Sequence, residues 1–142
     1  MDIVVDGLKA HVATGGRDPV AEEPVVILIH GSGMDRTVWQ FQSRNIAFRG
    51  IRVLAVDLPG HGKSEGKPPE TIAGMADWLN RFMDADDVKQ AILIGHSMGS
   101  LIALDMAARY PERVEKLVLM GVAETMPVHP DLLEAARQDL PL

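Results

Sequence analysis

The chain contains no cysteine, which excludes disulfide bonds and thiolate metal sites and is compatible with a reducing compartment. It also lacks a basic stretch: its formal net charge of −6 is spread along the chain, which argues against nucleic acid as a partner. The apolar runs are about five to eight residues long, far short of the roughly 20 needed to cross a bilayer. The N-terminus has neither a basic start nor a continuous apolar stretch, so its pattern is not that of a signal peptide. We therefore expect a cytoplasmic protein that binds neither nucleic acid nor membrane.

The 142 residues are enough for one domain with a real core, and strand-like and helix-like patterns alternate along them. The segments 2–5 and 8–14 flank Asp6-Gly7, a pair typical of a two-residue hairpin turn. The run 25–30 is continuously apolar until its last residue, which indicates a strand buried on both faces. Another buried strand is expected at 51–57, and further strands at 91–94 and 114–120. Helices are expected at 37–48, 71–85, 98–110 and 129–140. This order predicts an α/β fold, with a mostly parallel sheet, helices on both faces and an N-terminal β-hairpin.

Helical spacing also predicts which side chains of two of these helices face the core. In the segment 71–85 they are Ile72, Met75, Trp78, Leu79 and Phe82. The segment 37–48 is only weakly amphipathic, and there they are Val38, Phe41, Ile46 and Phe48.

The stretch "AILIGHSMGS", residues 91–100, runs from an apolar strand into a G-x-S-x-G pattern at the start of a helix. A strand-to-helix turn of this kind is so tight that side chains two positions either side of Ser97 would collide, and Gly95 and Gly99 avoid this. The turn presents the Ser97 side chain above the sheet and places the Met98 N–H where it can stabilise an oxyanion. The pentapeptide alone is short enough to recur by chance. Its position between a strand and a helix makes Ser97 a candidate nucleophile.

A second motif, "HGSG", spans His30 to Gly33 at the end of the strand 25–30. In open α/β sheets, chemistry gathers beyond the carboxyl ends of the strands. Gly31 and Gly33 let the main chain turn sharply there, which makes the Ser32 N–H a candidate second oxyanion donor. An ordinary strand-to-helix turn would use glycine in the same way. A dinucleotide-binding fingerprint is excluded, because Arg36 stands where its third glycine is needed.

A third motif, "DLPGHGKS", covers residues 57–64. Its Gly-Lys-Ser ending is also that of a phosphate-binding loop. That loop needs a glycine five residues before Gly62, where this chain has Asp57. We therefore interpret the segment as a tight turn after a strand, with Asp57 and His61 as structural polar residues.

Taken together, "HGSG", "DLPGHGKS" and "GHSMG", in this order and each after a strand, resemble the N-terminal half of an α/β-hydrolase fold protein. The resemblance extends from the hairpin to the strand 114–120. It implies that Ser97 is the nucleophile and that the N–H groups of Met98 and Ser32 form the oxyanion hole. It also implies that residues 1–124 form an α/β-hydrolase core lacking its last strands, and that residues 125–142 begin a cap region.

A serine nucleophile needs an adjacent base that is oriented by a third group. In the family that the chain resembles, the acid and then the histidine follow the serine along the sequence. Glu124 lies near a position where some members carry the acid, and His129 is the only histidine after Ser97. Neither is a convincing partner, and the same holds for His96, whose side chain should point away from the turn, and for His11 and His30. We expect the acid and the base to lie outside these 142 residues.

The strand 114–120 is expected to lie at an open, apolar edge of the sheet, with unpaired N–H and C=O groups. We therefore expect the chain alone to be aggregation-prone, or to pair at this edge with a complementary chain or a second copy.

The sequence thus predicts a serine hydrolase acting on a small-molecule carbonyl substrate: an ester, a lactone, a thioester or an activated C–C bond. No histidine pair or carboxylate cluster has ligand spacing, so neither a metal nor an organic cofactor is implied. Two alternatives stay open. The chain is a catalytically inactive fragment, split subunit or small-molecule-binding scaffold, or it has a cofactor-free perhydrolase or haloperoxidase-type activity, which shares the serine site in the resembled family.

Overall fold

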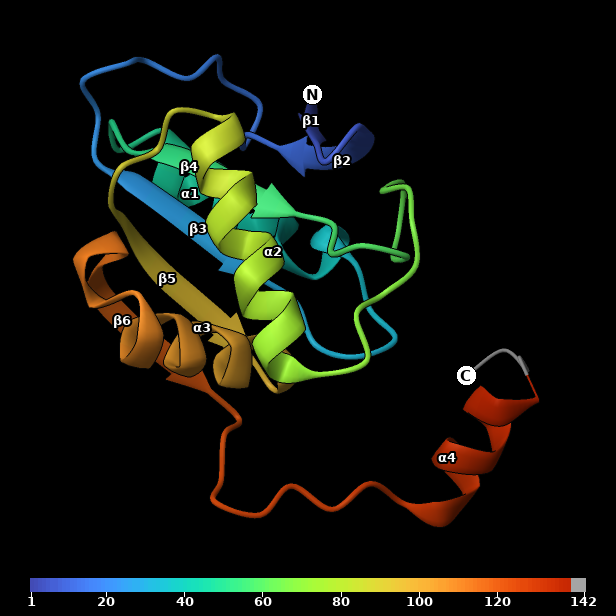
Figure 1. Ribbon diagram of the computed structural model, residues 1–142. Coiled ribbons are helices and arrows are strands. Elements are labelled where there is room, and N and C mark those ends of the chain that lie inside the picture. The colour runs from blue at the N-terminus through green and yellow to red at the C-terminus, as the bar shows by residue number, and fades with distance from the viewer. Residues whose placement is uncertain (139–142) are drawn as a thin grey trace.

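One sheet forms the centre of the computed structural model, which describes residues 1–138 (Figure 1). The order of its six strands is β1-β2-β4-β3-β5-β6. Their bounds are Asp2–Val5 for β1, Leu8–Ala13 for β2, Val25–Ile29 for β3, Arg52–Val56 for β4, Ala91–His96 for β5 and Val114–Met120 for β6. Strands β1 and β2 form an antiparallel hairpin, and β2 pairs antiparallel with β4. Strands β4, β3, β5 and β6 run parallel to one another. The predicted hairpin and mostly parallel sheet are confirmed.

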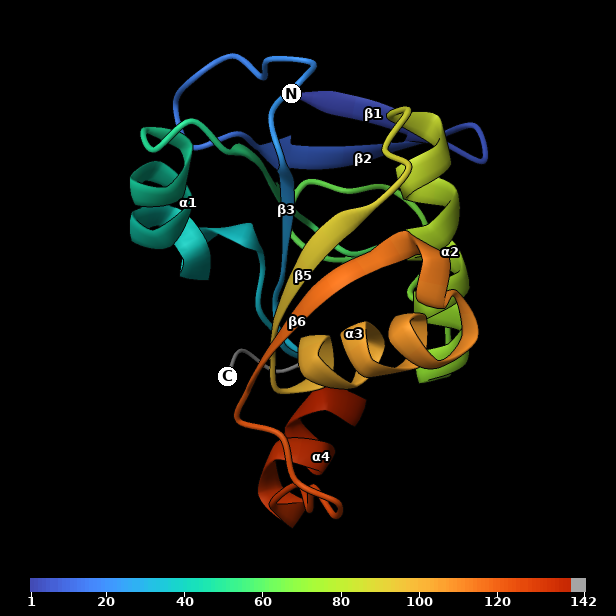
Figure 2. The same ribbon diagram turned by 90° about the vertical axis from the view of Figure 1, so that its left-hand side faces the viewer.

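Helices cover both faces of this sheet, as predicted. Figure 2 shows α1 on one face and α2 with α3 on the other. The helical segments are η1 (Arg36–Trp39), α1 (Gln40–Ala47), α2 (Ile72–Ala85), α3 (Met98–Arg109), η2 (Pro111–Arg113) and α4 (Pro130–Arg137). The last predicted helix is therefore shorter than 129–140, and residues 139 and 140 lie outside the described part of the chain. Within residues 1–138, every helix is too short or too polar to span a membrane.

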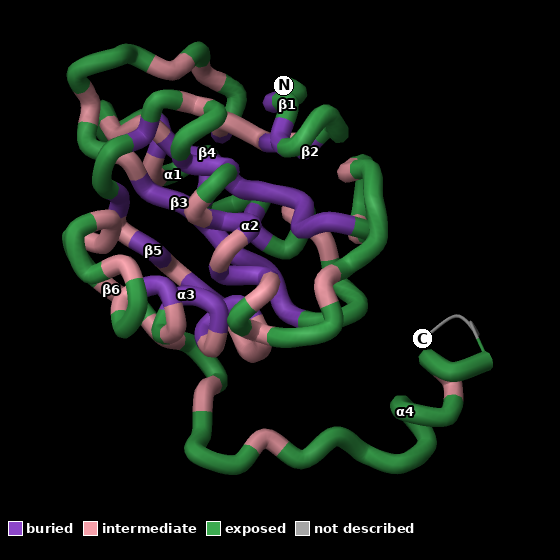
Figure 3. The backbone as a smooth tube through the Cα atoms, in the orientation of Figure 1, coloured by how far each residue is buried: buried purple, intermediate pink, exposed green. Residues whose placement is uncertain are grey.

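The core has two layers because successive residues of a strand point to opposite faces of the sheet. On β3, Ile27 and Ile29 belong to the larger cluster, which lies beneath α2 and α3. Val26 and Leu28 belong to the smaller cluster, which packs with Trp39 beside α1. Figure 3 shows the buried residues concentrated along the central strands and on the helices that cover them. A strand covered on both faces must be apolar throughout, which explains the uninterrupted runs in the sequence.

On α2, the predicted inward positions are confirmed. Met75, Trp78, Leu79 and Phe82 are buried, and Ile72 is partly buried against the same cluster. The helix begins at a defined residue because the Thr71 hydroxyl accepts a hydrogen bond from the Gly74 N–H at 3.0 Å.

On the segment 37–48, the predicted inward residues are mostly wrong. Phe41 is 76% exposed, Phe48 65% and Val38 44%, and only Ile46 is partly buried. The reason is that residues 36–39 form a 3₁₀ helix, whose three residues per turn shift the inward face of the helix α1 after it. The buried residues here are Trp39, Ser43 and Ala47. Ser43 and Ala47 lie against the main chain at Gly15, where a Cβ added to the glycine would be 2.6 Å from the Cβ of Ala47. Small side chains on α1 suit this close contact.

Beyond β6, the chain leaves the sheet, and α4 stands apart from it in Figure 1. Leu132 and Leu133 on this helix are 50% and 45% exposed. In the described part of the chain, β6 is an edge strand, with Val118 and Met120 more than two-fifths exposed. The edge position that we expected is thus confirmed. Pairing of this edge with another chain stays a prediction, as does the division into a core at 1–124 and a cap from 125.

Two phenylalanines of opposite burial test this core. Phe82→Ala should lower the free energy of unfolding by about 3–5 kcal/mol, because it leaves a cavity under α2. Phe41→Ala removes the same atoms from an exposed position and should change it by less than about 0.5 kcal/mol. Urea unfolding followed by circular dichroism measures both, and equal losses would contradict the burial described above.

Candidate active site

Ser97 lies at the carboxyl end of β5, in the turn that leads directly into α3. Its φ of 55° and ψ of −118° lie in a backbone region that residues other than glycine rarely adopt. The Ser97 N–H donates to the Met120 carbonyl at 2.8 Å, which ties this turn to the end of β6. Within residues 1–138, the Ser97 hydroxyl has no hydrogen-bond partner. The predicted turn from strand to helix is therefore present, with a side chain that is not engaged elsewhere.

Close main-chain contacts explain why glycine flanks Ser97. A Cβ at Gly95 would overlap the carbonyl group of Gly99, so the two glycines face each other across the turn. A Cβ at Gly99 would overlap the Ile29 carbonyl oxygen and lie 2.7 Å from that of His30. The first turn of α3 thus rests directly on the end of β3. Any side chain at Gly95 or Gly99 would push these segments apart.

The turn after β3 lies beside Ser97, as the order of the strands requires. A Cβ on Gly31 would be only 3.3 Å from the Ser97 Cβ. Gly33 has a φ of +69°, a left-handed conformation in which glycine is favoured. The structure therefore brings "HGSG" and "GHSMG" together at one edge of the sheet.

Two main-chain N–H groups near Ser97, those of Met98 and Ser32, have no acceptor among the described residues. The Gly31 carbonyl accepts hydrogen bonds from the Met34 N–H at 3.3 Å and from His30 Nδ1 at 2.7 Å. In a trans peptide, the N–H points opposite to the carbonyl of the preceding residue. These two bonds therefore turn the Ser32 N–H away from His30 and leave it free for a ligand.

His30 orients this turn and is poorly suited to act as a base. The ring is fully buried, and its Nε2 accepts a hydrogen bond from the Leu58 N–H at 3.1 Å. Since Nε2 accepts, the proton of the neutral ring is on Nδ1, which donates it to the Gly31 carbonyl. Burial holds the pKa of His30 below its ordinary value. Both nitrogens are thus occupied, and the ring joins the loops after β3 and β4.

Asp57 joins the same two loops. Its fully buried carboxylate accepts hydrogen bonds from the Arg36 N–H and Arg36 Nη1 at 2.7 and 2.6 Å, and from the Lys63 N–H at 2.8 Å. A Cβ at Gly62 would overlap this carboxylate, which explains the glycine there. His61 Nδ1 donates to the Pro59 carbonyl at 2.9 Å. These contacts support the structural roles predicted for Asp57 and His61.

Two contributors were missed by the sequence reasoning, Arg36 and Ser100. In the sequence, Arg36 served only to exclude a dinucleotide-binding motif. In the structure, its guanidinium pairs with the Asp57 carboxylate. Ser100 is fully buried, and its Oγ lies 2.7 Å from the Gly95 carbonyl and 2.9 Å from that of Met120. It also accepts the Met120 N–H at 3.1 Å, so it links β5, β6 and α3. In the sequence, the only signal for Ser100 was a serine in the first turn of a predicted helix, directly after the G-x-S-x-G pattern.

The remaining histidines and Glu124 do not make a base and an acid for Ser97 in the described residues. His11 lies 2.6 Å from Asp2 on the hairpin, and the exposed His129 caps α4 by accepting the Asp131 N–H at 3.2 Å. Glu124 is exposed on the segment that leaves the sheet. The expectation that the His96 side chain points away from the turn is wrong: an added Cβ at Gly31 would lie 3.4 Å from His96 Nδ1 and 3.3 Å from the Ser97 Cβ, and one at Gly121 would lie 3.7 Å from the His96 ring. Within residues 1–138, no hydrogen bond joins a histidine to Ser97.

A metal site would need several ligating side chains close together. Within residues 1–138, no three His, Asp or Glu side chains cluster in a way that could hold an ion.

The burial of His30 predicts a pH dependence of folding. Its folded-state pKa is lowered, so below about pH 6.5 the unfolded chain binds a proton that the folded protein rejects. Stability should therefore fall as the pH drops from 7.5 to 5.5. His30→Asn removes this titration and should lose less stability over that range, when each protein is compared with itself at pH 7.5. His129→Asn, an exposed control, should behave like the parent in urea unfolding, and equal pH slopes for all three would contradict a buried neutral His30.

The strain at Ser97 predicts a second effect. Ser97→Gly should raise the free energy of unfolding by about 1 kcal/mol, because glycine adopts the positive φ without steric cost. Ser97→Ala keeps the Cβ and therefore the strain, so its stability should stay close to that of the parent. Urea unfolding distinguishes the two, and a Ser97→Gly variant no more stable than Ser97→Ala would argue against a strained turn.

Relatives of the chain are found among curated proteins. A dihydrolipoyllysine-residue acetyltransferase component of the acetoin cleaving system of Cupriavidus necator is 37% identical over 118 residues, 82% of this chain and 30% of that protein. A 2-hydroxy-6-oxononadienedioate/2-hydroxy-6-oxononatrienedioate hydrolase of Burkholderia vietnamiensis is 37% identical over 129 residues, 85% of this chain and 43% of that protein. The chain thus spans less than half the length of these relatives.

A solved structure shares the fold. The crystal structure of a membrane phospholipase A, described as a bacterial virulence factor, superimposes with a TM-score of 0.78 and 34% identity over 98% of this chain and 44% of that one. The model of the family described as alpha/beta hydrolase fold matches residues 24–142. A sheet of this order, the turn at Ser97 and this match lead to one conclusion: the chain belongs to the α/β-hydrolase fold family.

Proposed function

We propose that Ser97 is the nucleophile of a serine hydrolase that acts on a small-molecule carbonyl substrate. The observation that carries this proposal is the strained turn at Ser97, with two main-chain N–H groups beside it that lack acceptors. A folded protein keeps such strain only where the surrounding structure enforces it, and such positions cluster at active sites. The relatives that are named hydrolase and phospholipase A support the reaction class.

In this proposal, Ser97 Oγ attacks the carbonyl carbon and its proton passes to a base. The negative charge that develops on the carbonyl oxygen is stabilised by the N–H groups of Met98 and Ser32. Collapse of this intermediate expels the leaving group, which takes the proton from the base, and water then releases the acyl group by the same steps. A histidine oriented by Asp or Glu is the base, and residues outside the described part of this chain supply both.

The substrate is an ester, a lactone, a thioester or an activated C–C bond next to a carbonyl, since each offers an electrophilic carbon to Ser97. Residues 125–142 begin a cap over the site in this proposal, which would make the residues that follow α4 the main determinants of substrate choice. The exposed Leu132 and Leu133 on α4 support a cap, because they present apolar surface for further packing.

A non-catalytic role is the second candidate, and a specific observation favours it: no histidine of residues 1–138 is hydrogen-bonded to Ser97. In this alternative, the chain works as a scaffold that binds a small molecule, or as one part of a split enzyme. A complementary chain or a second copy would then pair with the exposed edge of β6.

The test is the Ser97→Ala variant of the intact protein that carries this chain. Hydrolysis of p-nitrophenyl esters should fall by a factor on the order of 10⁴ or more, because the acyl-enzyme cannot form. A fluorophosphonate probe should label the parent and fail to label the variant. Thr14→Ala, which removes a hydroxyl at the end of β2, should keep the parent's rate. If Ser97→Ala retains turnover, Ser97 is not the nucleophile; if the parent neither turns over esters nor takes the label, the scaffold alternative is favoured.

A further inference from the structure

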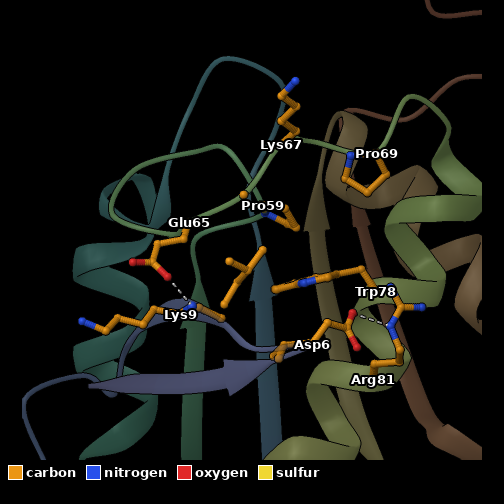
Figure 4. Close-up of a pocket in the computed structure, with 12 residues that line it drawn as sticks. Asp6, Lys9, Pro59, Glu65, Lys67, Pro69, Trp78 and Arg81 are labelled. Atoms are coloured by element: carbon orange, nitrogen blue, oxygen red, sulfur yellow. Dashed lines mark hydrogen bonds and ion pairs between the residues drawn. The ribbon is translucent and has the colours of Figure 1, made fainter.

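A cavity of about 190 Å³ lies between the β1–β2 hairpin, the loop after β4 and the helix α2 (Figure 4). None of the residues that we assign to the Ser97 site lines it. It adjoins β1 and β2, whereas Ser97 ends β5 on the other side of β4 and β3 in the sheet order. It is thus a second hollow, and a ligand there would not need chemistry at Ser97.

Apolar side chains form one part of the cavity wall, and Trp78 is the most firmly held of them. Trp78 is only 8% exposed and stacks on Phe82, with ring centroids 5.5 Å apart, so its ring is held in one orientation. Pro59 and Pro69 come from the loop and Leu8 from the hairpin. Rigid walls favour binding, because little side-chain freedom is lost when a ligand enters.

Glycine keeps part of the cavity open. Gly66 has a φ of +91°, and a Cβ there would come within 3.0 Å of the Leu8 Cδ1. A larger residue would both strain the loop and project into the space beside Leu8. The cavity therefore depends on the absence of a side chain at this position.

The rim carries three cationic side chains, Lys9, Lys67 and Arg81, and two carboxylates, Asp6 and Glu65. Arg81 Nε pairs with Asp6 at 2.8 Å, and Glu65 accepts the main-chain N–H of Lys9 at 2.9 Å. The ammonium groups of Lys9 and Lys67 have no ion-pair partner within residues 1–138. Figure 4 shows both at the periphery, with Lys67 extending from the loop. The charged side chains that line the cavity thus sum to +1, whereas the whole chain has a net charge of −6, and this local positive excess favours an anion.

The volume limits the size of the ligand. A dry cavity of about 150 Å³ holds one benzene molecule, so about 190 Å³ accommodates one six-membered ring with a small substituent. We propose that this cavity binds a small aromatic or alicyclic monocarboxylate. The ring lies against Trp78 and the two prolines, and the carboxylate lies at the rim, within reach of the flexible side chains of Lys9 and Lys67.

Benzoate is the probe for this proposal, and the Trp78 indole N–H of the ¹⁵N-labelled chain is the reporter. The Trp78→Phe spectrum assigns that signal. We expect a saturable shift with a dissociation constant of about 1–10 mM, as suits a ligand of this size. Benzamide has the same shape without the charge and should bind about fivefold more weakly, which matches the loss of exposed charge pairs.

The lysines supply the matched variants. Lys9→Gln/Lys67→Gln should weaken benzoate binding about fivefold and leave benzamide binding unchanged. Lys89→Gln/Lys116→Gln makes the same change in net charge at two exposed lysines away from the cavity and should leave both ligands unaffected. Three results would overturn the proposal: no saturable shift at the Trp78 indole up to about 50 mM benzoate, equal affinity for benzoate and benzamide, or equal effects of the two double variants. None of these bears on Ser97, so this proposal and the proposed hydrolase can fail separately.

Discussion

The site depends on the direct contact between the main chain of α3 and that of β3. Gly99 lies against the carbonyl groups at the end of β3, and Gly95 faces it across the turn. The short turn between these segments holds Ser97 at a positive φ. The Met98 N–H is left without an acceptor for the same reason, since it belongs to a helix end that no side chain caps.

Buried polar groups then fix the loops around this contact. His30 and Asp57 are both fully buried, and each joins the loop after β3 to the loop after β4. Burying such groups is costly unless their hydrogen bonds are made, and here they are. The orientation of the Gly31–Ser32 peptide follows from this network. Ser100 ties the end of β6 to β5 by hydrogen bonds, as His30 ties the loop after β3 to the loop after β4. In the proposed hydrolase, the oxyanion donors are thus placed by residues that do not touch the substrate.

Much of the fold could be predicted because the signals for it are local. Apolar runs marked the strands, since a strand covered on both faces must be apolar along its length. The failure on α1 has an equally local cause that the sequence did not reveal. A short 3₁₀ segment at residues 36–39 shifted the inward face to Trp39, Ser43 and Ala47 and left Phe41 and Phe48 exposed. Apolar residues alone predicted a face here, whereas the packing buries two small residues, Ser43 and Ala47, together with Trp39.

By itself, the sequence determined the order of strands and helices and the position of the sharp turn at Ser97, because glycine spacing and apolar runs act over a few residues. The tertiary structure decided what surrounds that turn. Arg36 meets Asp57, and Ser100 meets the end of β6, across about 20 residues of chain. The hollow beside Trp78 forms only where the hairpin, the loop after β4 and α2 converge. Such contacts depend on how distant segments pack against each other, and no pattern within one segment records them.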